Sequence, residues 1–143
     1  MIAVDTNILV YARRKEMPLH RPARTLLEEL AHGDRPWTVP WPCVYEFLRV
    51  VTHPRVFDPP SDPGIVLDGL RSLMQSPSLV MLSEGPSHWN SMKRAIHASQ
   101  TSGNLIHDAH IAALLLEHGV DELWTHDRDF ARFPGLRVRF PLK

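Results

Sequence analysis

Two acidic residues lie on helical stripes that are otherwise apolar. Asp108 falls at the helical spacing of Ile111 and Leu115, and Glu46 stands beside Phe47 on a second such stripe. Aspartate and glutamate are seldom buried unless they are paired or bound to a ligand. The two acids therefore indicate a functional site.

Two further acids stand directly after predicted strands. Asp5 ends the first apolar run of the chain, and Asp127 follows the last well-marked one. Glu46 and Asp108 fall in the first turns of their helices. In a parallel sheet these positions meet at the carboxyl edge, where open α/β folds bind ligands. We therefore expect the four carboxylates to converge.

Converging carboxylates repel one another unless a cation lies among them. Mg²⁺ or Mn²⁺ fits such a set because hard divalent cations prefer oxygen ligands. A metal held in this way positions phosphate oxygens and activates water for phosphodiester cleavage. Simpler interpretations remain open: Asp5 and Asp127 could cap helices, Glu46 could mark the edge of an apolar face, and Asp129 could be solvated.

Histidines offer a different chemistry. His107 and His110 flank Asp108, and His126 precedes Asp127. Imidazoles could bind zinc or act as general acid and base. No third convergent histidine is evident from the sequence, so exposed helix histidines are the favoured interpretation.

Length and composition predict one ordinary globular domain over residues 1–143. No apolar stretch is long enough to span a membrane, and the N-terminus lacks the basic region of a secretory signal. A cytoplasmic protein is the default expectation. The single cysteine, Cys43, allows no internal disulfide and is expected to be an ordinary buried thiol.

Apolar runs alternate between strand-like and helix-like patterns. This alternation predicts an α/β fold of three αβα layers, with a central, mostly parallel sheet of four to five strands. Expected strands cover 1–4, 37–39, 79–82 and 122–125, with an edge strand near Val138; expected helices cover 8–12, 22–33, 42–51, 65–73, 87–99 and 105–118, with a helical turn over 127–130.

Several segments together resemble the PIN-domain ribonuclease toxins of the VapBC type. These are Asp5-Thr-Asn-Ile-Leu-Val-Tyr-Ala12, Glu46 in a Pro-initiated helix, the run from Gly103 to Ala113, and Thr125-His-Asp-Arg-Asp-Phe130. The resemblance implies a PIN-like fold and an Mg²⁺- or Mn²⁺-dependent endoribonuclease. It also implies a homodimer that a small antitoxin inhibits in a heterotetramer or larger assembly.

The resemblance also implies roles for single residues. The positions that match the family's catalytic and metal-binding acids are Asp5, Glu46, Asp108 and Asp127, and those that match its accessory polar positions are Asn7, Thr125 and Asp129. The fourth acidic position varies in that family, so the resemblance supports a metal-binding role for Asp127 less strongly than for the other three acids.

The formal net charge is zero, with 16 basic and 16 acidic residues. A general nucleic-acid-binding protein is usually basic. Setting the four site acids aside leaves 12 acidic against 16 basic residues. The basic residues near the expected site, which could contact phosphates, are Arg13, Arg14, Lys15, Arg49 and Arg55.

Other functions compete with a ribonuclease. A phosphatase with an aspartyl-phosphate intermediate needs a second aspartate where this chain has Asn7. Another Mg²⁺-dependent phosphohydrolase, or a non-catalytic PIN-like interaction module, stays an alternative. An antitoxin tail could lay a helix on spare apolar surface around Ile8–Tyr11 and Val44–Val51 and direct an arginine into the acids.

Overall fold

The computed structural model describes the whole chain, residues 1–143. Short strands alternate with helices, as the sequence predicts. The elements are β1 (Ile2–Val4), α1 (Thr6–Arg13), α2 (His20–His32), β2 (Trp37–Thr38), α3 (Trp41–Val51), α4 (Pro63–Met74), α5 (His88–Ser99), the 3₁₀ turn Gly103–Leu105, α6 (Ile106–Glu117), β3 (Glu122–Trp124), the 3₁₀ turn Arg128–Arg132 and β4 (Arg137–Arg139).

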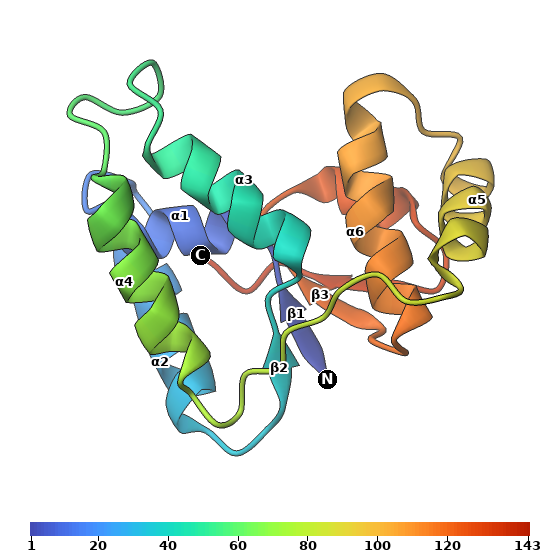
Figure 1. Cartoon of the computed structure of the whole chain (residues 1–143), viewed down its shortest axis with the longest axis horizontal. Helices are drawn as coiled ribbons and strands as arrows, with labels where there is room; N and C mark the ends of the chain where they lie inside the picture. The colour runs from blue at the N-terminus through green and yellow to red at the C-terminus, as the bar shows by residue number, and fades with distance from the viewer.

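The four strands form one all-parallel sheet in the order β2-β1-β3-β4. Figure 1 shows α1, α2 and α4 on one side of the sheet and α5 and α6 on the other, with α3 between the two groups. This arrangement confirms the predicted α/β fold. Because all strands run in one direction, the residues that follow β1 and β3 emerge at the same edge.

The core lies where the sheet meets the helices. β1 is buried along its whole length, and α6 contributes a continuous buried run from Ile111 to Leu115. Ile8 and Leu9 of α1 and Phe47 of α3 are also buried. The core therefore uses part of the apolar surface of these two helices, but Leu9 and Phe47 also line an apolar groove, and the partner surface expected here stays a prediction.

One predicted strand is absent. Residues 79–82 form no strand, and Leu79 makes only an isolated parallel bridge to Trp37. The reason lies in the neighbouring strand, since β2 is two residues long and Pro40 soon follows it. Proline has no N–H for a sheet hydrogen bond, so the pairing cannot extend.

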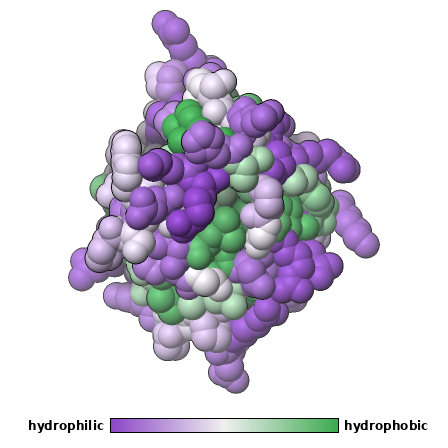
Figure 2. All heavy atoms as spheres, turned by 90° about the vertical axis from the view of Figure 1, so that its right-hand side faces the viewer, coloured by the Kyte–Doolittle hydropathy of each residue, from purple (hydrophilic) through white to green (hydrophobic).

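The outer face of α5 and α6 is mostly polar. Figure 2 views this side and shows apolar side chains gathered near its centre within a polar surround. Leu116 and the exposed Trp89 belong to these two helices. None of the helices combines the length and the apolar character needed to cross a membrane.

Candidate active site

Asp5 stands directly between β1 and α1 and is 4% exposed. Its carboxylate accepts a hydrogen bond from the backbone N–H of Thr6 at 2.7 Å. Asp5 is therefore the N-cap of α1, which agrees with the simpler interpretation of Asp5 as a helix cap. The cap also holds its second carboxylate oxygen toward the carboxyl edge of the sheet, where the other predicted residues lie.

Thr125 connects the residues that follow β1 and β3. Its hydroxyl donates to Asp5 Oδ2 at 2.7 Å and accepts from Asn7 Nδ2 at 3.2 Å and from the Asp127 N–H at 3.0 Å. These three bonds use the full capacity of a hydroxyl group. Asn7 in turn accepts from the backbone N–H of His126 at 3.2 Å. The structure thus brings the expected accessory residues Asn7 and Thr125 to the acids.

Asp108 begins α6 beside the turn that follows β3. Carboxylate oxygens of Asp108, Asp127 and Asp129 lie within 4.8 Å of one another. Asp127 also accepts from the Asp129 N–H at 2.9 Å and so caps the turn that follows it. Asp129 is exposed and contacts Arg132 at 3.3 Å. Asp127 is therefore both a cap and a member of the acidic cluster.

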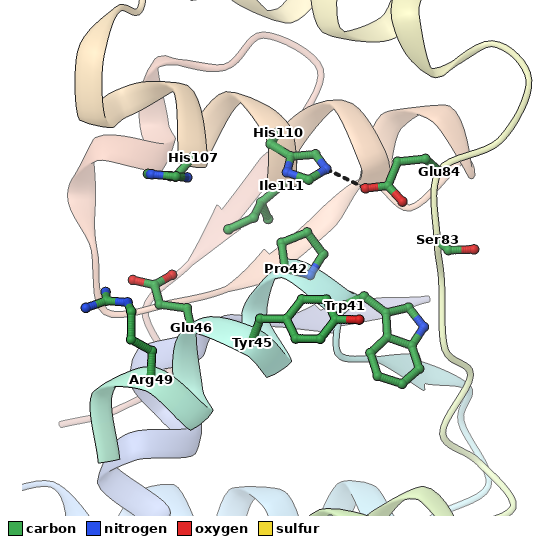
Figure 3. Close-up of a pocket in the computed structure, with 10 residues that line it drawn as sticks. All are labelled: Trp41, Pro42, Tyr45, Glu46, Arg49, Ser83, Glu84, His107, His110 and Ile111. Atoms are coloured by element: carbon green, nitrogen blue, oxygen red, sulfur yellow. Dashed lines mark hydrogen bonds and ion pairs between the residues drawn. The ribbon is translucent and has the colours of Figure 1, made fainter. Parts of the chain in front are cut away.

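Glu46 reaches the same region from α3. Its Oε2 atom accepts from the Thr6 hydroxyl at 3.2 Å. Figure 3 shows its carboxylate turned toward α6, in a pocket of about 540 Å³ that α3 and α6 line. Arg49 and His107 lie on either side of this carboxylate. The four predicted acids thus gather at one edge of the sheet, with the pocket leading to Glu46.

Burial and mutual repulsion disfavour the charged forms of two acids. Burial raises the pKa of Asp5 to about 6, and the Glu46 charge adds to this rise. Burial also raises the pKa of Asp108 to about 7, and the Asp127 charge is the next largest cause. Asp5, Asp108, Glu46 and Asp127 form no ion pair with lysine or arginine. These four residues form the acidic cluster, and no basic side chain neutralises their charge; only the neighbouring Asp129 pairs with an arginine, Arg132.

Cys43 lies against the acidic cluster. It is fully buried, as expected, and its Sγ atom donates to Asp5 Oδ1 at 3.6 Å. Burial raises the pKa of the Cys43 thiol, with the Asp5 charge adding to the effect. The thiol therefore remains a neutral donor that helps to orient Asp5.

The predicted phosphate contacts divide in two. Arg14 cannot serve, because it is held by Glu16, by the Ser61 hydroxyl at 3.0 Å and over the Phe57 ring at 4.3 Å. Arg49, by contrast, is exposed and lines the pocket beside Glu46. Of the five basic residues expected to contact phosphate, Arg49 is the one that shares the pocket with an acid of the cluster.

The predicted histidines also lie in different surroundings. His107 lines the pocket, His126 packs edge-on against Tyr11, and His110 pairs with Glu84 at 2.7 Å. His88 is a further histidine that the sequence pattern does not predict, and α5 brings its ring to a centroid distance of 5.3 Å from the His110 ring. No spacing could have revealed this pair, because the two residues lie on different helices joined by the 100–105 segment.

Comparisons with known proteins agree with this geometry. The PIN domain family matches residues 2–136. The VapC ribonuclease Mb2897 of Mycobacterium bovis is 40% identical over 142 residues, covering 99% of this chain and 96% of the relative. Ribonuclease VapC48 of Mycobacterium tuberculosis is 34% identical over 137 residues, covering 96% and 94%. The crystal structure of VapBC2 from Rickettsia felis, bound to a DNA fragment from their promoter, has a TM-score of 0.68 at 19% identity, covering 97% and 98%.

Proposed function

The chain belongs to the PIN-domain family, and we propose that it is the endoribonuclease toxin of a toxin–antitoxin pair. The observation that carries this proposal is the un-neutralised acidic cluster beside an open pocket. The names of its relatives, VapC ribonucleases, support RNA as the substrate. The proposed reaction is hydrolysis of an RNA phosphodiester bond.

The acidic cluster fits a divalent metal ion. Asp5, Glu46, Asp108 and Asp127 offer only oxygen atoms, which Mg²⁺ and Mn²⁺ prefer, and Asp129 lies within reach as an accessory ligand. A bound ion of this kind draws in phosphate oxygens and lowers the pKa of water. Burial and mutual repulsion raise the pKa values of Asp5 and Asp108, and a divalent cation among these carboxylates would favour their charged forms.

Neighbouring side chains hold the carboxylates in fixed positions. Thr125 and Cys43 each donate to one oxygen of Asp5, and Thr6 donates to Glu46. These donors contribute no charge, so they orient the carboxylates and leave their negative charge in place for the cation. Such outer hydrogen bonds tune metal sites, and their loss typically costs about 10–100-fold in affinity or activity.

The pocket suits a single-stranded nucleic acid. Trp41 and Tyr45 stack at 5.9 Å on its rim, and Tyr45 is 65% exposed. Aromatic faces of this kind stack on unpaired bases, and an arginine contacts the phosphates between them. We assign these roles to the Trp41–Tyr45 pair and to Arg49, which lines the same pocket.

An antitoxin is the proposed protein partner. A groove of about 320 Å³ between α1, α2 and α4 is lined mainly by apolar side chains, among them Leu9, Leu27 and Leu70. An amphipathic helix of the antitoxin fits such a groove, and the fold neighbour VapBC2 supports a VapBC-type assembly. We further propose a homodimer that acts in the cytoplasm, where it would meet both RNA and antitoxin.

Incubation of the purified chain with RNA tests the proposed activity. Cleavage should require Mg²⁺ or Mn²⁺ and should stop when EDTA is added. Asp5→Asn should abolish cleavage, whereas Asp68→Asn, a matched change of an exposed aspartate on α4, should not. Cleavage that continues undiminished in EDTA would overturn the metal-dependent mechanism.

A further inference from the structure

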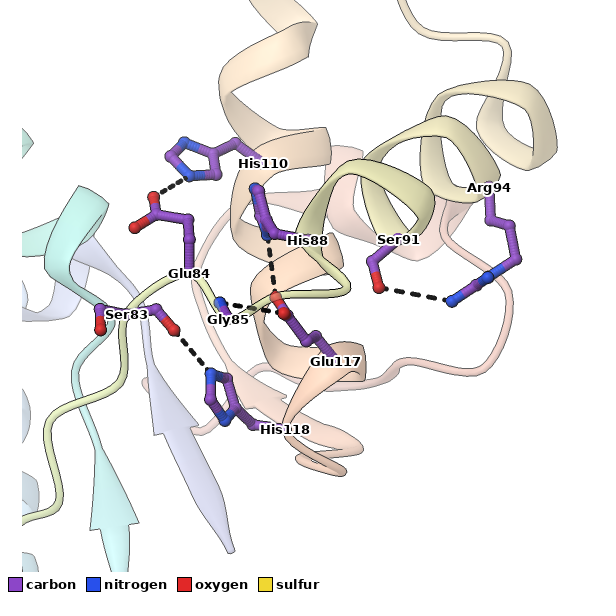
Figure 4. A network of polar contacts seen from close by, with 9 residues as sticks. All are labelled: Ser83, Glu84, Gly85, His88, Ser91, Arg94, His110, Glu117 and His118. Atoms are coloured by element: carbon purple, nitrogen blue, oxygen red, sulfur yellow. Dashed lines mark hydrogen bonds and ion pairs between the residues drawn. The ribbon is translucent and has the colours of Figure 1, made fainter.

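A second cluster of metal-binding side chains lies apart from the acids, where the segment before α5 meets α6. Glu84, His88 and His110 place one ligand atom each within 4.8 Å of the others. Figure 4 shows these side chains gathered between α5 and α6. They come from a loop and two helices, so the tertiary fold brings them together.

Hydrogen bonds already orient this cluster. His110 Nε2 donates to Glu84 Oε1 at 2.7 Å, and His88 Nδ1 donates to Glu117 Oε2 at 2.9 Å. The side chain of Glu117 is only 7% exposed, and its other oxygen accepts from the Gly85 N–H at 3.0 Å. A carboxylate fixed in this way behind an imidazole is the usual support of a metal-bound histidine, and it leaves Nε2 of His88 for a ligand.

We propose that Glu84, His88 and His110 form a zinc site distinct from the acidic cluster. Two imidazole nitrogens and one carboxylate oxygen, with water in the fourth position, are a common Zn²⁺ ligand set, whereas Mg²⁺ prefers oxygen ligands throughout. Tetrahedral ligands at about 2.0–2.1 Å from zinc lie about 3.3 Å apart. The 4.8 Å limit on the present separations leaves only small side-chain movements to reach that geometry.

The site is open enough to load from solvent. The side chains of His110 and Glu84 are 31% and 44% exposed. Zinc would take the place of the hydrogen bond between these two side chains, with His110 Nε2 as a ligand atom in place of a donor. The ion joins the loop at Glu84 to both α5 and α6.

This link also fixes one wall of the pocket. Glu84 and His110 line the pocket that holds Glu46 and Arg49. Zinc therefore makes the wall opposite α3 more rigid without entering the acidic cluster. The inference does not depend on the proposed ribonuclease activity, because it concerns ligand chemistry alone.

Zinc binding to the full-length chain, measured by equilibrium dialysis in excess Mg²⁺, tests the proposal. We expect one Zn²⁺ per chain in the unsubstituted protein and in Asp108→Asn. Glu117→Gln removes the support of His88 and should weaken zinc binding by roughly 10–100-fold. Glu84→Gln and His88→Ala remove ligands and should weaken zinc binding by more than that. His97→Ala, an exposed histidine on the same helix as His88, should bind like the unsubstituted chain.

Substitution with Co²⁺ supplies an independent readout, because tetrahedral Co²⁺ absorbs visible light far more strongly than octahedral Co²⁺. The strong band should be present in Asp108→Asn and absent from His88→Ala and Glu84→Gln. Glu84 is on a partly exposed loop, so its amide variant should fold even if His88→Ala does not. Zinc that is lost in Asp108→Asn but kept in Glu84→Gln would overturn the proposal, as would no zinc binding by the folded unsubstituted chain.

Discussion

The acidic cluster and the His–Glu cluster share α6 but surround their carboxylates with different partners. Asp108, near the start of α6, faces other carboxylates, and its pKa rises to about 7 because of burial and their repulsion. His110 and Glu117, farther along the helix, each pair with an oppositely ionising partner at 2.7 and 2.9 Å. One helix thus presents a cluster of carboxylates that face one another and a cluster in which each carboxylate is hydrogen-bonded to an imidazole.

The difference indicates what each cluster requires. Uncharged donors, such as the hydroxyl of Thr125, orient the acidic cluster but cannot offset its charge, so an added cation would stabilise it at neutral pH. In the His–Glu cluster, imidazoles already hydrogen-bond to the carboxylates, so a metal must displace the His110–Glu84 hydrogen bond to bind. Hard cations should favour the first cluster and zinc the second.

Asp108→Asn, like Asp5→Asn, should have the largest effect on catalysis. The substitution removes a charged oxygen ligand while keeping the size of the side chain, so RNA cleavage in Mg²⁺ should fall by about 100-fold or more, the upper end of the cost of losing an outer-shell bond. Single-turnover cleavage rates measure the change, with Asp68→Asn as the matched control. A loss of the same size in Glu117→Gln, also on α6, would mean that the two clusters act as one site.

Thr125→Val should have the next largest effect. Valine keeps the shape of the side chain but removes the hydroxyl that joins Asp5, Asn7 and the Asp127 N–H. Mg²⁺ affinity or cleavage should fall by about 10–100-fold. Cleavage rates measured across an Mg²⁺ titration distinguish a loss of Mg²⁺ affinity from a loss of the maximal cleavage rate.

Thr101→Val is the control for that change. Thr101 is also buried and bonds the Ser99 hydroxyl at 2.9 Å, at the end of α5 and away from the acids. Thr101→Val should lower the melting temperature with little change in the rate of RNA cleavage. Equal losses of activity in the two variants would show that Thr125 acts through general stability.

The acidic cluster could be predicted from the sequence because local rules place its members. Asp5 and Asp127 follow strands, and Glu46 and Asp108 lie in the first two turns of their helices, so a parallel sheet brings them to one edge. Nothing comparable marks His88. Its contact with His110 depends on how α5 packs on α6, and no periodicity records that packing.

The other errors also arise from tertiary packing. The strand expected at 79–82 has the right apolar residues, but its only neighbour, β2, is too short to pair with it. Arg14 stands where a phosphate contact was expected, yet the 57–61 segment folds back and holds its guanidinium. In each case the local pattern is sound, and a distant segment decides the outcome.

Acidification without metal should stabilise the fold. The pKa values of Asp5 and Asp108, about 6 and about 7 against an ordinary 3.8, mean that the folded state binds these protons more tightly than the unfolded state. The contribution of these two protons to the free energy of unfolding is therefore present at low pH and is lost as the pH rises through 6 and 7. In EDTA the melting temperature should fall by several degrees between pH 5.5 and 8, at about 3 °C per kcal/mol.

Asp108→Asn isolates the contribution of that residue. The variant should melt higher than the unsubstituted chain in EDTA at pH 8, and the two should converge on acidification. Mg²⁺ at about a hundredfold excess over Kd should stabilise the unsubstituted chain by about 2.7 kcal/mol and the variant far less. Parallel pH curves for the two proteins would contradict the assignment of crowded charge to Asp108.

Glu84→Gln should have the smallest effect on the melting temperature in EDTA, and it tests the His–Glu cluster. Glu84 and His110 form a partly exposed pair, and such pairs contribute about 0–1 kcal/mol, so the melting temperature should change by no more than about 3 °C. Glu28→Gln, which breaks the exposed Arg24–Glu28 pair, gives the matched scale. Added Zn²⁺ should then separate the proteins, because ligand binding raises stability by RT ln(1 + [L]/Kd) only where the site is intact. A drop of many degrees in EDTA would show that the Glu84–His110 pair is a structural clamp. The His–Glu cluster would then stabilise the fold without any cation, in contrast to the acidic cluster, which is expected to need one.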